Sequence, residues 1–455
     1  MATNTSGQFA LIFALCLPVI VGLGGFALDY SFWVSQRSNI RAAADAAALA
    51  AARQMMIGTT TTSQVQAIAA ATVDANILAP KGLGGKHTTA TEIIDNGTAI
   101  AVTITQDKAS YFSRAIGLEI GTLSARSSAR IVGGTKICVV TLSGTSSEAL
   151  AFGTGAKLIG EDCGIYVNSE NPSAVTVGGN AQVTASVLCA AGGIRGSTSL
   201  ATLNTSVITD CPPMPDPLAS RDNLLPNIPV CIAPPAPAPG LMFARDMNFQ
   251  ISQIIYSTGT HTLPAGRYCI DVVITGNAKV TLQSEKNYFF GNKLEVSGDA
   301  EFYGPNAALI FHSRDSFFEF RDNAKIDISA PTTGNTAGML IWQPRVYRQG
   351  GTNLCVNPGS YGANLCSPNG YLRFKISANR ANKLVGVIYL AQGSLYAAAD
   401  RPIADQSPWT AIISSEFELR LGPTVVLNTK YSQTSVPVPA ALANNRATAK
   451  VYLQN

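Results

Sequence analysis

Charged residues are scarce in this chain. They make up 13% of the 455 residues, whereas ordinary soluble proteins contain about 25%. The 32 Lys and Arg residues against 28 Asp and Glu give a net charge of +4, and no run of five like charges occurs. This balance argues against a nucleic-acid partner and against a cytosolic enzyme. The 46% hydrophobic content is nevertheless enough to bury the cores of two or three domains.

Histidine and catalytic motifs are equally scarce. The chain has three His, and it lacks a Gly-x-Ser-x-Gly elbow, a P-loop and an HExxH motif. We interpret His261 and His312 as structural residues, because they are far apart in sequence and His312 lies in an apolar strand. A von Willebrand-type metal site would need Asp before Ser143, Ser146 and Ser147, and none stands there, so a polar turn is expected. No catalytic residue, cofactor or metal is predicted.

Zinc-type cysteine spacing is also missing. No C-x2-C pair is present among the nine cysteines. Cys16 lies in an apolar run, and the other eight follow it, which favours an oxidising compartment with up to four disulfides. Because eight cysteines allow 105 pairings, only the short-range disulfide Cys355–Cys366 is predicted as a specific pair.

Residues 9–28 form an apolar run of twenty residues without a charge. At 1.5 Å per residue such a helix covers the roughly 30 Å core of a bilayer. We expect one retained transmembrane helix, and the alternative is a signal peptide cleaved near residues 42–44. Residues 31–56 are rich in alanine and continue the helix. Their alanine face either packs closely on another helix or reflects helix propensity alone.

The N-terminal motifs resemble a known family. Residues 8–15 (QFALIFAL), Pro18, the pair Asp29-Tyr30 and residues 36–50 (QRSNIRAAADAAALA) look like the TadE/TadG-like segment of Flp pilus-assembly proteins. The match covers about residues 7–54. Two later blocks, residues 111–117 (YFSRAIG) and 163–168 (CGIYVN), are also similar to TadG-like chains. The resemblance implies a single-pass protein of the bacterial envelope, tied to the tight-adherence pilus and its secretion apparatus.

A small α+β unit is predicted after the alanine-rich stalk. Residues 62–77 have helical apolar spacing, and a loop follows them. Residues 99–105 and 122–132 read as strands, with a short helical turn at 111–116 between them. A long helix followed by such a unit is pilin-like in outline.

From residue 136 onward, a short unit of the form apolar-x-Gly-Asn/Asp-Ala-x-apolar recurs. It occurs at residues 177–183, 274–280, 296–302 and 320–326, with looser copies at 155–158 and 421–425. The spacing is 22 residues from Asn277 to Asp299 and 24 from Asp299 to Asn323. Such a period predicts stacked coils, in a right-handed parallel β-helix or β-solenoid with Asn or Asp at left-handed corners. A two-sheet sandwich is the alternative.

A proline-rich stretch interrupts this repeat. Ten of the 24 prolines lie in residues 212–239, so this segment is predicted as an extended loop or linker that divides the β region. The predicted organisation is a tail (1–8), a transmembrane helix (9–28), a helical stalk (29–80), an α+β unit (81–135), a first β segment (136–211), a Pro-rich loop (212–239), a main β domain (240–435) and a C-terminal tail (436–455).

Carboxylates and aromatic residues of the β region are the remaining candidates for chemistry. A polysaccharide-active β-helix would use clustered carboxylates with Arg or Lys, but Asp299 and Asp322 are explained by turn preference. The candidates are Asp271, Asp299, Asp322, Asp327, Arg314 and Arg321. Exposed aromatic residues could form a binding face, although strand alternation should bury some of them. These are Phe317, Phe318, Phe320, Trp342, Tyr347 and Trp409.

The sequence therefore predicts a mainly β, non-enzymatic protein with an N-terminal transmembrane helix. We expect it in the bacterial inner membrane with its bulk in the periplasm, where its N-terminal helix contacts other pilus-assembly components and supports cell adhesion. The alternative is an exported polysaccharide-active or carbohydrate-binding β-helix protein.

Overall fold

The computed structural model describes most of the chain in two compact units. The residues described are 6–55, 62–77, 86–94, 99–108, 112–115, 117, 121–132, 136–196, 202–236, 238–347, 365–443 and 450–454. The first unit comprises residues 1–134 and 446–455, and the second comprises 135–445. The second unit is thus inserted in sequence before the last strand of the first.

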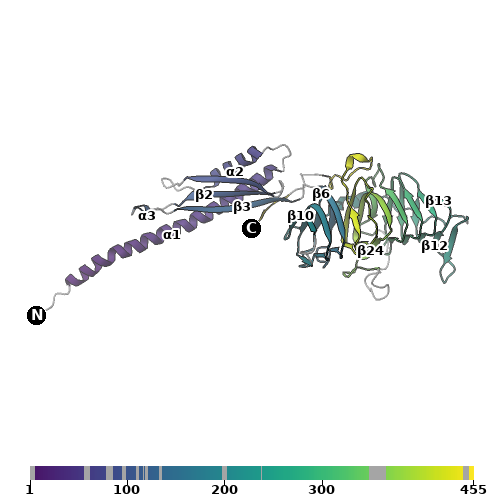
Figure 1. Cartoon of the computed structure of the whole chain (residues 1–455), viewed down its shortest axis with the longest axis horizontal. Coiled ribbons are helices and arrows are strands. Elements are labelled where there is room, and N and C mark those ends of the chain that lie inside the picture. Colours follow the sequence, from purple (N-terminus) through teal and green to yellow (C-terminus); the bar gives the residue numbers. More distant parts are fainter. Residues whose placement is uncertain are drawn as a thin grey trace. The chain divides into compact units, whose positions relative to one another are not determined.

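The first unit is a long helix with a four-stranded antiparallel sheet (Figure 1). The sheet order is β1-β2-β3-β28, so the last strand of the chain lies next to β3. The elements are α1 (Ser6–Met55), α2 (Thr62–Asn76), β1 (His87–Ile94), β2 (Ala99–Asp107), α3 (Phe112–Ala115), β3 (Thr122–Val132) and β28 (Lys450–Gln454).

The alanine face of α1 forms the core of this unit. Small side chains recur on one face of the helix and let its backbone approach α2 and the sheet closely. Val65 and Ala69 of α2 and Val102 and Ile104 of β2 complete the cluster. The buried alanines are Ala43, Ala44, Ala47, Ala48, Ala51 and Ala52. The alanine face is therefore covered by this chain's own helix and strands.

Two segments of this unit differ from the sequence prediction. Strand β1 lies where a loop was expected, and β28 lies inside the expected C-terminal tail. Both are edge strands that pair along one side, β1 with β2 and β28 with β3. Their structure depends on partners that are distant in sequence, which local patterns do not reveal. The expected strands at 99–105 and 122–132 and the short helical turn are present as β2, β3 and α3.

In the residues that the structure describes, the second unit has 24 strands, β4 to β27, which we call the parallel stack. Apart from the antiparallel pair β11–β12, the strand pairs described in this unit are parallel. Strands β12 to β22 each pair with the strand three positions later, so that Val272 is in register with Leu294 and Leu294 with Phe318, whereas β4 to β8 each pair with the strand two positions later. Figure 1 shows these strands side by side. This arrangement agrees with the predicted period of 22 to 24 residues.

The bounds of the stack elements are as follows. The first strands are β4 (Lys136–Thr141), β5 (Leu150–Phe152), β6 (Lys157–Val167), β7 (Val175–Val177), β8 (Gln182–Ala190), β9 (Ile194–Gly196) and β10 (Thr202–Ile208). The 3-10 helix η3 (Ala219–Leu224) lies between them and β11 (Leu241–Arg245), β12 (Ile251–Tyr256), β13 (Thr260–Leu263), β14 (Gly266–Tyr268), β15 (Asp271–Ile274), β16 (Lys279–Leu282), β17 (Lys286–Phe290) and β18 (Lys293–Val296). The rest are β19 (Glu301–Gly304), β20 (Ala307–Phe311), β21 (Phe317–Phe320), β22 (Lys325–Ser329), β23 (Met339–Gln343), β24 (Leu372–Ile376), β25 (Arg380–Ala397), β26 (Thr410–Leu419), β27 (Thr424–Val426) and the 3-10 helix η5 (Tyr431–Gln433).

Each copy of the recurring unit joins two strands through a tight turn. The alanines at its fifth position, Ala181, Ala278, Ala300 and Ala324, are fully buried. The residue that has a left-handed backbone conformation in this turn differs in type between the copies. Asn180 and Asp322 have positive φ, but in the copies at 274–280 and 296–302 the glycines Gly276 and Gly298 have it instead of Asn277 and Asp299. The prediction of Asn or Asp at the corner is wrong for these two copies, because glycine adopts positive φ without a Cβ clash.

The proline-rich segment lies on the stack and does not divide it. Strands before it and strands far after it are direct neighbours, since Val139 of β4 pairs with Ile412 of β26 and Lys157 of β6 with Thr424 of β27. The strands of the first β segment therefore continue the parallel pairing of the last strands, β26 and β27. This explains why the repeat is interrupted for 97 residues in sequence although the strand pairing is continuous.

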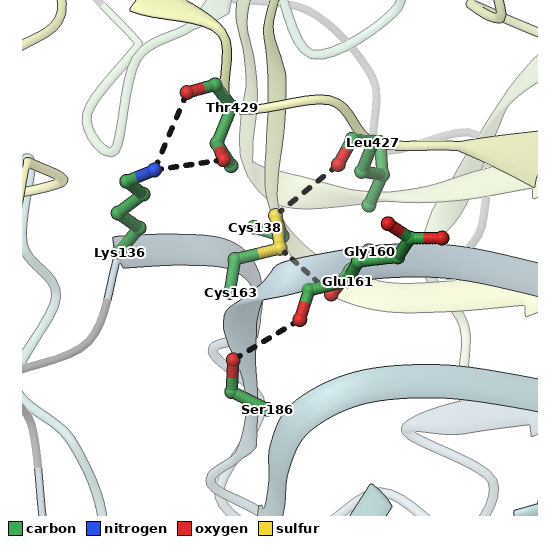
Figure 2. The surroundings of a disulfide bond; sticks show 8 residues. All are labelled: Lys136, Cys138, Gly160, Glu161, Cys163, Ser186, Leu427 and Thr429. Atoms are coloured by element: carbon green, nitrogen blue, oxygen red, sulfur yellow. Dashed lines mark hydrogen bonds between the residues drawn. A yellow bond between two sulfur atoms is a disulfide. The ribbon is translucent and has the colours of Figure 1, made fainter. Parts of the chain in front are cut away.

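Three disulfides cross-link the parallel stack. They join Cys138 to Cys163, Cys189 to Cys211 and Cys231 to Cys269. Figure 2 shows the first of these, which connects the paired strands β4 and β6 below the carbonyl of Leu427. Nearby, the Lys136 ammonium donates to the carbonyl and hydroxyl of Thr429 at 3.4 and 3.1 Å. These contacts fix the early strands to the late ones. The predicted pair Cys355–Cys366 stays a prediction, because Cys355 lies outside the described residues.

Candidate functional site

The apolar part of α1 has an unusual surface. Within residues 12–28 every side chain is exposed or only half-buried, and these side chains are almost all apolar. Exposure of so many large hydrophobic residues to water is unfavourable. By length and composition, this helix is able to cross a membrane.

A polar clip lies directly after this apolar surface. The Asp29 side chain is fully buried, although the residues just before and just after it in α1 are exposed. Its Oδ1 accepts the backbone N–H of Phe112 at 3.2 Å, and its Oδ2 accepts the backbone N–H and hydroxyl of Ser113 at 2.8 and 2.6 Å. The carboxylate thus binds amides that would otherwise lack partners at the start of α3.

Gly25 makes this contact possible. It lies one helical turn before Asp29, on the same face of α1. A Cβ at Gly25 would lie 2.4 Å from the Phe112 ring, whereas Cβ atoms at Gly22 and Gly24 would meet nothing within 4 Å. Helix α3 therefore docks on α1 at two points: Gly25 leaves room for the Phe112 ring, and Asp29 accepts backbone N–H groups of α3. We call Gly25, Asp29, Phe112 and Ser113 the α1–α3 clip.

A polar pocket of about 410 Å³ lies on the parallel stack. Its walls come from segments far apart in sequence, including the proline-rich segment and the ends of several strands. The lining residues are Leu142, Ser143, Gly144, Asn168, Asp216, Arg345, Tyr371, Ala391, Gln392 and Ser415. We call this the polar pocket.

An internal ion pair sets the charge of the polar pocket. The Asp216 side chain is 8% exposed, and its Oδ2 accepts Arg345 Nη1 at 3.3 Å and the Tyr389 hydroxyl at 2.7 Å. Burial, with the neighbouring carboxylate of Asp216, raises the pKa of Tyr389, so the phenol stays protonated. The backbone N–H of Arg345 donates to Asp222 at 3.0 Å. The two aspartates of the proline-rich segment therefore hold Arg345 in place.

The opposite wall contains hydroxyl groups and a turn. Tyr371 is half-buried, and its hydroxyl donates to Ser143 Oγ at 3.3 Å. The predicted polar turn is present, because Ser143 and Ser146 are hydrogen-bonded at 2.6 Å. Close to this turn lies Glu416, which is 1% exposed. Burial raises the pKa of its carboxyl against hydrogen bonds that lower it.

The predicted carboxylates do not converge on one point. Asp299 accepts the Asn323 amide at 2.6 Å and Asp322 accepts the backbone N–H of Gly298 at 3.1 Å, so both link turns of adjacent coils. Asp271 accepts the backbone N–H of Lys293, and Asp327 pairs with Lys383. Of the two arginines, Arg321 pairs with Glu295 and, at 3.5 Å, with the neighbouring Asp322, whereas Arg314 lies over the Tyr347 ring. Among the described residues, no group of three or more His, Cys, Asp or Glu could hold a metal ion.

The predicted histidines and aromatic residues are structural. His312 is fully buried, and His261 bonds the carbonyl of Thr258 at 2.7 Å. Phe318, Phe320, Trp342 and Trp409 are buried in the stack, and Phe317 and Tyr347 are half-buried. The expected burial of some of these rings by strand alternation is confirmed, because Phe318 and Phe320 lie in the core with their rings stacked on each other, while Phe317 of the same strand is only half-buried.

The sequence missed the pocket residues Asp216, Arg345 and Tyr371. Asp216 lies between prolines, and Arg345 and Tyr371 lie at the two ends of the long segment between β23 and β24, so no local motif marks them. Only the stacking of coils brings them together. The Asp29-Tyr30 pair, in contrast, was singled out in sequence as part of a family motif.

Residues 7–54 match the Tad family model, described as Flp pilus-assembly TadE/G-like. This confirms the resemblance seen in the N-terminal sequence, and the matched segment contains the apolar surface of α1 together with Gly25 and Asp29. Neither a curated protein nor a solved structure matches the chain.

Proposed function

We propose that this chain is a membrane-anchored structural protein of the Flp (tight-adherence) pilus assembly and secretion apparatus. The observation that carries the proposal is the coincidence of the TadE/G-like match with the apolar surface of α1. In this proposal α1 crosses the bacterial inner membrane once, and the bulk of the chain lies in the periplasm. The three disulfides of the parallel stack support an oxidising location.

The proposal includes a closed right-handed β-helix for the second unit. Parallel pairing of strands β12 to β22, each with the strand three positions later, supports this proposal, because such a coil produces that pattern. The buried alanines at the fifth position of the repeat support tight corners of constant shape. A rigid rod of this kind suits a scaffold that is exposed outside the membrane and supports adhesion.

Contact with other assembly components is proposed through the apolar surface of α1. The alanine face is covered by the chain's own α2 and sheet, so it is not offered to a partner. Residues 12–28 remain, and Gly22 and Gly24 on this segment have open space around them. Small residues on a membrane helix allow close approach of a second helix.

The test uses a strain that lacks the gene, complemented with single variants and scored for surface pili and adherence. We expect Asp29→Ala to impair pilus assembly because it breaks the α1–α3 clip, and Arg53→Ala, at an exposed position of the same helix outside the motif 36–50, to leave it intact. Protease accessibility in spheroplasts locates the parallel stack. Normal piliation without the gene, or a protease-resistant stack in intact spheroplasts, contradicts the proposal.

The alternative is a polysaccharide-active β-helix enzyme, and a second pair of variants separates the two. Asp299→Asn with Asp322→Asn keeps the turn hydrogen bonds and removes both charges, so a structural protein should work normally. Val296→Ala with Phe302→Ala should lower protein level, because truncating a buried Phe costs about 3 to 5 kcal/mol. Loss of function by the Asn pair at normal abundance would favour a carboxylate-dependent activity.

A further inference from the structure

The polar pocket has no role in membrane anchoring or in the α1–α3 clip. We propose that it is a binding site for a neutral, polyhydroxylated ligand, namely one unit of an uncharged oligosaccharide. Its volume of about 410 Å³ lies within the range of ligand sites, about 300 to 1,000 Å³.

The charge of the pocket favours an uncharged ligand. Asp216 and Arg345 are opposite charges at 3.3 Å, and they line the same pocket. They are the two charged residues of the lining, and each compensates the other, so the lining itself carries no net charge. An ionic ligand would have to break this pair and leave the buried Asp216 without its cation, which is costly.

The polar groups of the pocket suit hydroxyls. The hydroxyls of Tyr371 and Ser415 donate to Ser143 and Ala391, so their oxygens can accept from ligand hydroxyls, and the half-exposed Arg345 guanidinium carries five N–H donors, one of which reaches Asp216. The Tyr371 ring adds an aromatic surface beside its hydroxyl. Such a combination matches a sugar ring, which presents both C–H and O–H groups.

The pocket walls are held before any ligand binds. Asn168 exchanges two hydrogen bonds of 2.7 Å with the backbone of Met214. The Ser415 hydroxyl donates to the carbonyl of Ala391 at 2.7 Å. The backbone N–H of Tyr371 donates to Ser367 Oγ at 3.1 Å, which closes a tight turn. Walls fixed in this way reduce the entropic cost of binding.

An apolar peptide is a poorer fit. Only Leu142 and Ala391 contribute apolar side chains to the lining. An apolar side chain in this pocket would remove water from the hydroxyls and from the ion pair without replacing their hydrogen bonds. The chemistry of the lining therefore selects a ligand that is itself hydrogen-bonding and neutral.

The test is a binding measurement on the full chain in a detergent without a sugar headgroup. Chitotetraose, cellotetraose and maltotetraose are the neutral probes, and tetragalacturonate is the anionic one. We expect saturation-transfer NMR signals and a calorimetric Kd of about 1 mM or below for at least one neutral probe. Tyr371→Ala and Arg345→Gln should each weaken that binding about tenfold or more.

Tyr303→Ala is the matched control, because Tyr303 is 45% exposed on the stack and is not part of the pocket lining. Circular dichroism and the thermal midpoint show which variants fold. If Tyr371→Ala does not fold, the binding measured for Arg345→Gln decides the test. The proposal is overturned if no neutral probe binds at about 10 mM, if folded pocket variants bind as the wild type does, or if tetragalacturonate binds more tightly than the neutral probes. None of these results bears on pilus assembly, so the two proposals fail separately.

Discussion

Asp29 and Ser113 are 84 residues apart in sequence, yet one carboxylate oxygen of Asp29 accepts both the backbone N–H and the hydroxyl of Ser113. The aspartate lies just after an apolar surface that would span a membrane, and it is fully buried. A buried carboxylate is tolerated there because Phe112 and Ser113 supply its hydrogen bonds. The clip thus links the family-matched helix to the α+β unit.

The first prediction is that Asp29→Ala destabilises the first unit by about 1 kcal/mol or somewhat more, as loss of a helix cap does. Two backbone N–H groups lose their acceptor. Asp29→Asn keeps an acceptor oxygen and should cost less. Hydrogen exchange at the Ser113 amide in detergent micelles measures the effect, and Asp45→Ala is the control. Equal exchange in Asp29→Ala and the control would contradict the role of the clip.

The second prediction uses the glycines of α1. Gly25→Ala should displace the Phe112 ring, because the added Cβ would lie 2.4 Å from it. Gly24→Ala adds the same atom where nothing lies within 4 Å, so it should be neutral or slightly favourable to the helix. Hydrogen exchange in α3 should rise in the first variant and stay unchanged in the second. If both variants behave alike, the close contact at Gly25 is not what holds α3.

Local patterns predicted the elements that do not depend on distant partners. The apolar run, the alanine-rich helix and the strands at 99–105 and 122–132 follow from periodicity. The recurring Gly-Asn/Asp-Ala unit revealed the coil period, because each copy must turn at the same place. Edge strand β28 could not be predicted, since its partner β3 lies more than 300 residues earlier.

The two candidate sites also differ in how far local sequence patterns could predict them. The α1–α3 clip was partly visible because Asp29 lies in a family motif. The polar pocket was invisible, because Asp216 and Arg345 are 129 residues apart and meet only when the proline-rich segment folds onto the stack. The carboxylates chosen from sequence were conspicuous only because the repeat places Asp in turns, where Asp299 and Asp322 link neighbouring coils.

The third prediction concerns the cysteines. Thiol counting on denatured, unreduced protein should find one reactive thiol, Cys16, if the three described disulfides and the predicted pair Cys355–Cys366 all form. A count of three thiols would contradict the predicted disulfide Cys355–Cys366. A count of eight or nine would contradict an oxidising compartment. Replacing both Cys138 and Cys163 by Ala should lower the free energy of unfolding by about 2 to 4 kcal/mol.

The last prediction is a pH dependence caused by His312. This side chain is fully buried beside the Phe289 ring, and no hydrogen-bond partner of either ring nitrogen is found in the described structure. Burial, with the positive charge of Arg267, lowers the pKa of His312 from 6.5 to about 4. In the unfolded chain the imidazole returns to its ordinary pKa, so below pH 6.5 the unfolded state binds a proton that the folded state rejects.

The contribution of the neutral His312 side chain to the free energy of unfolding is therefore fully present above pH 6.5, and it is lost as the pH falls from 6.5 to 4. The loss amounts to roughly 3 kcal/mol at the lower end. His312→Leu should remove this part of the pH dependence and change stability little at pH 7, because no hydrogen bond is lost there. Denaturant unfolding, followed by the fluorescence of the buried Trp342 and Trp409, measures it at several pH values. His261→Gln is the control, and a variant His312→Leu that loses stability with acid as steeply as the wild type would show that His312 is not the group responsible.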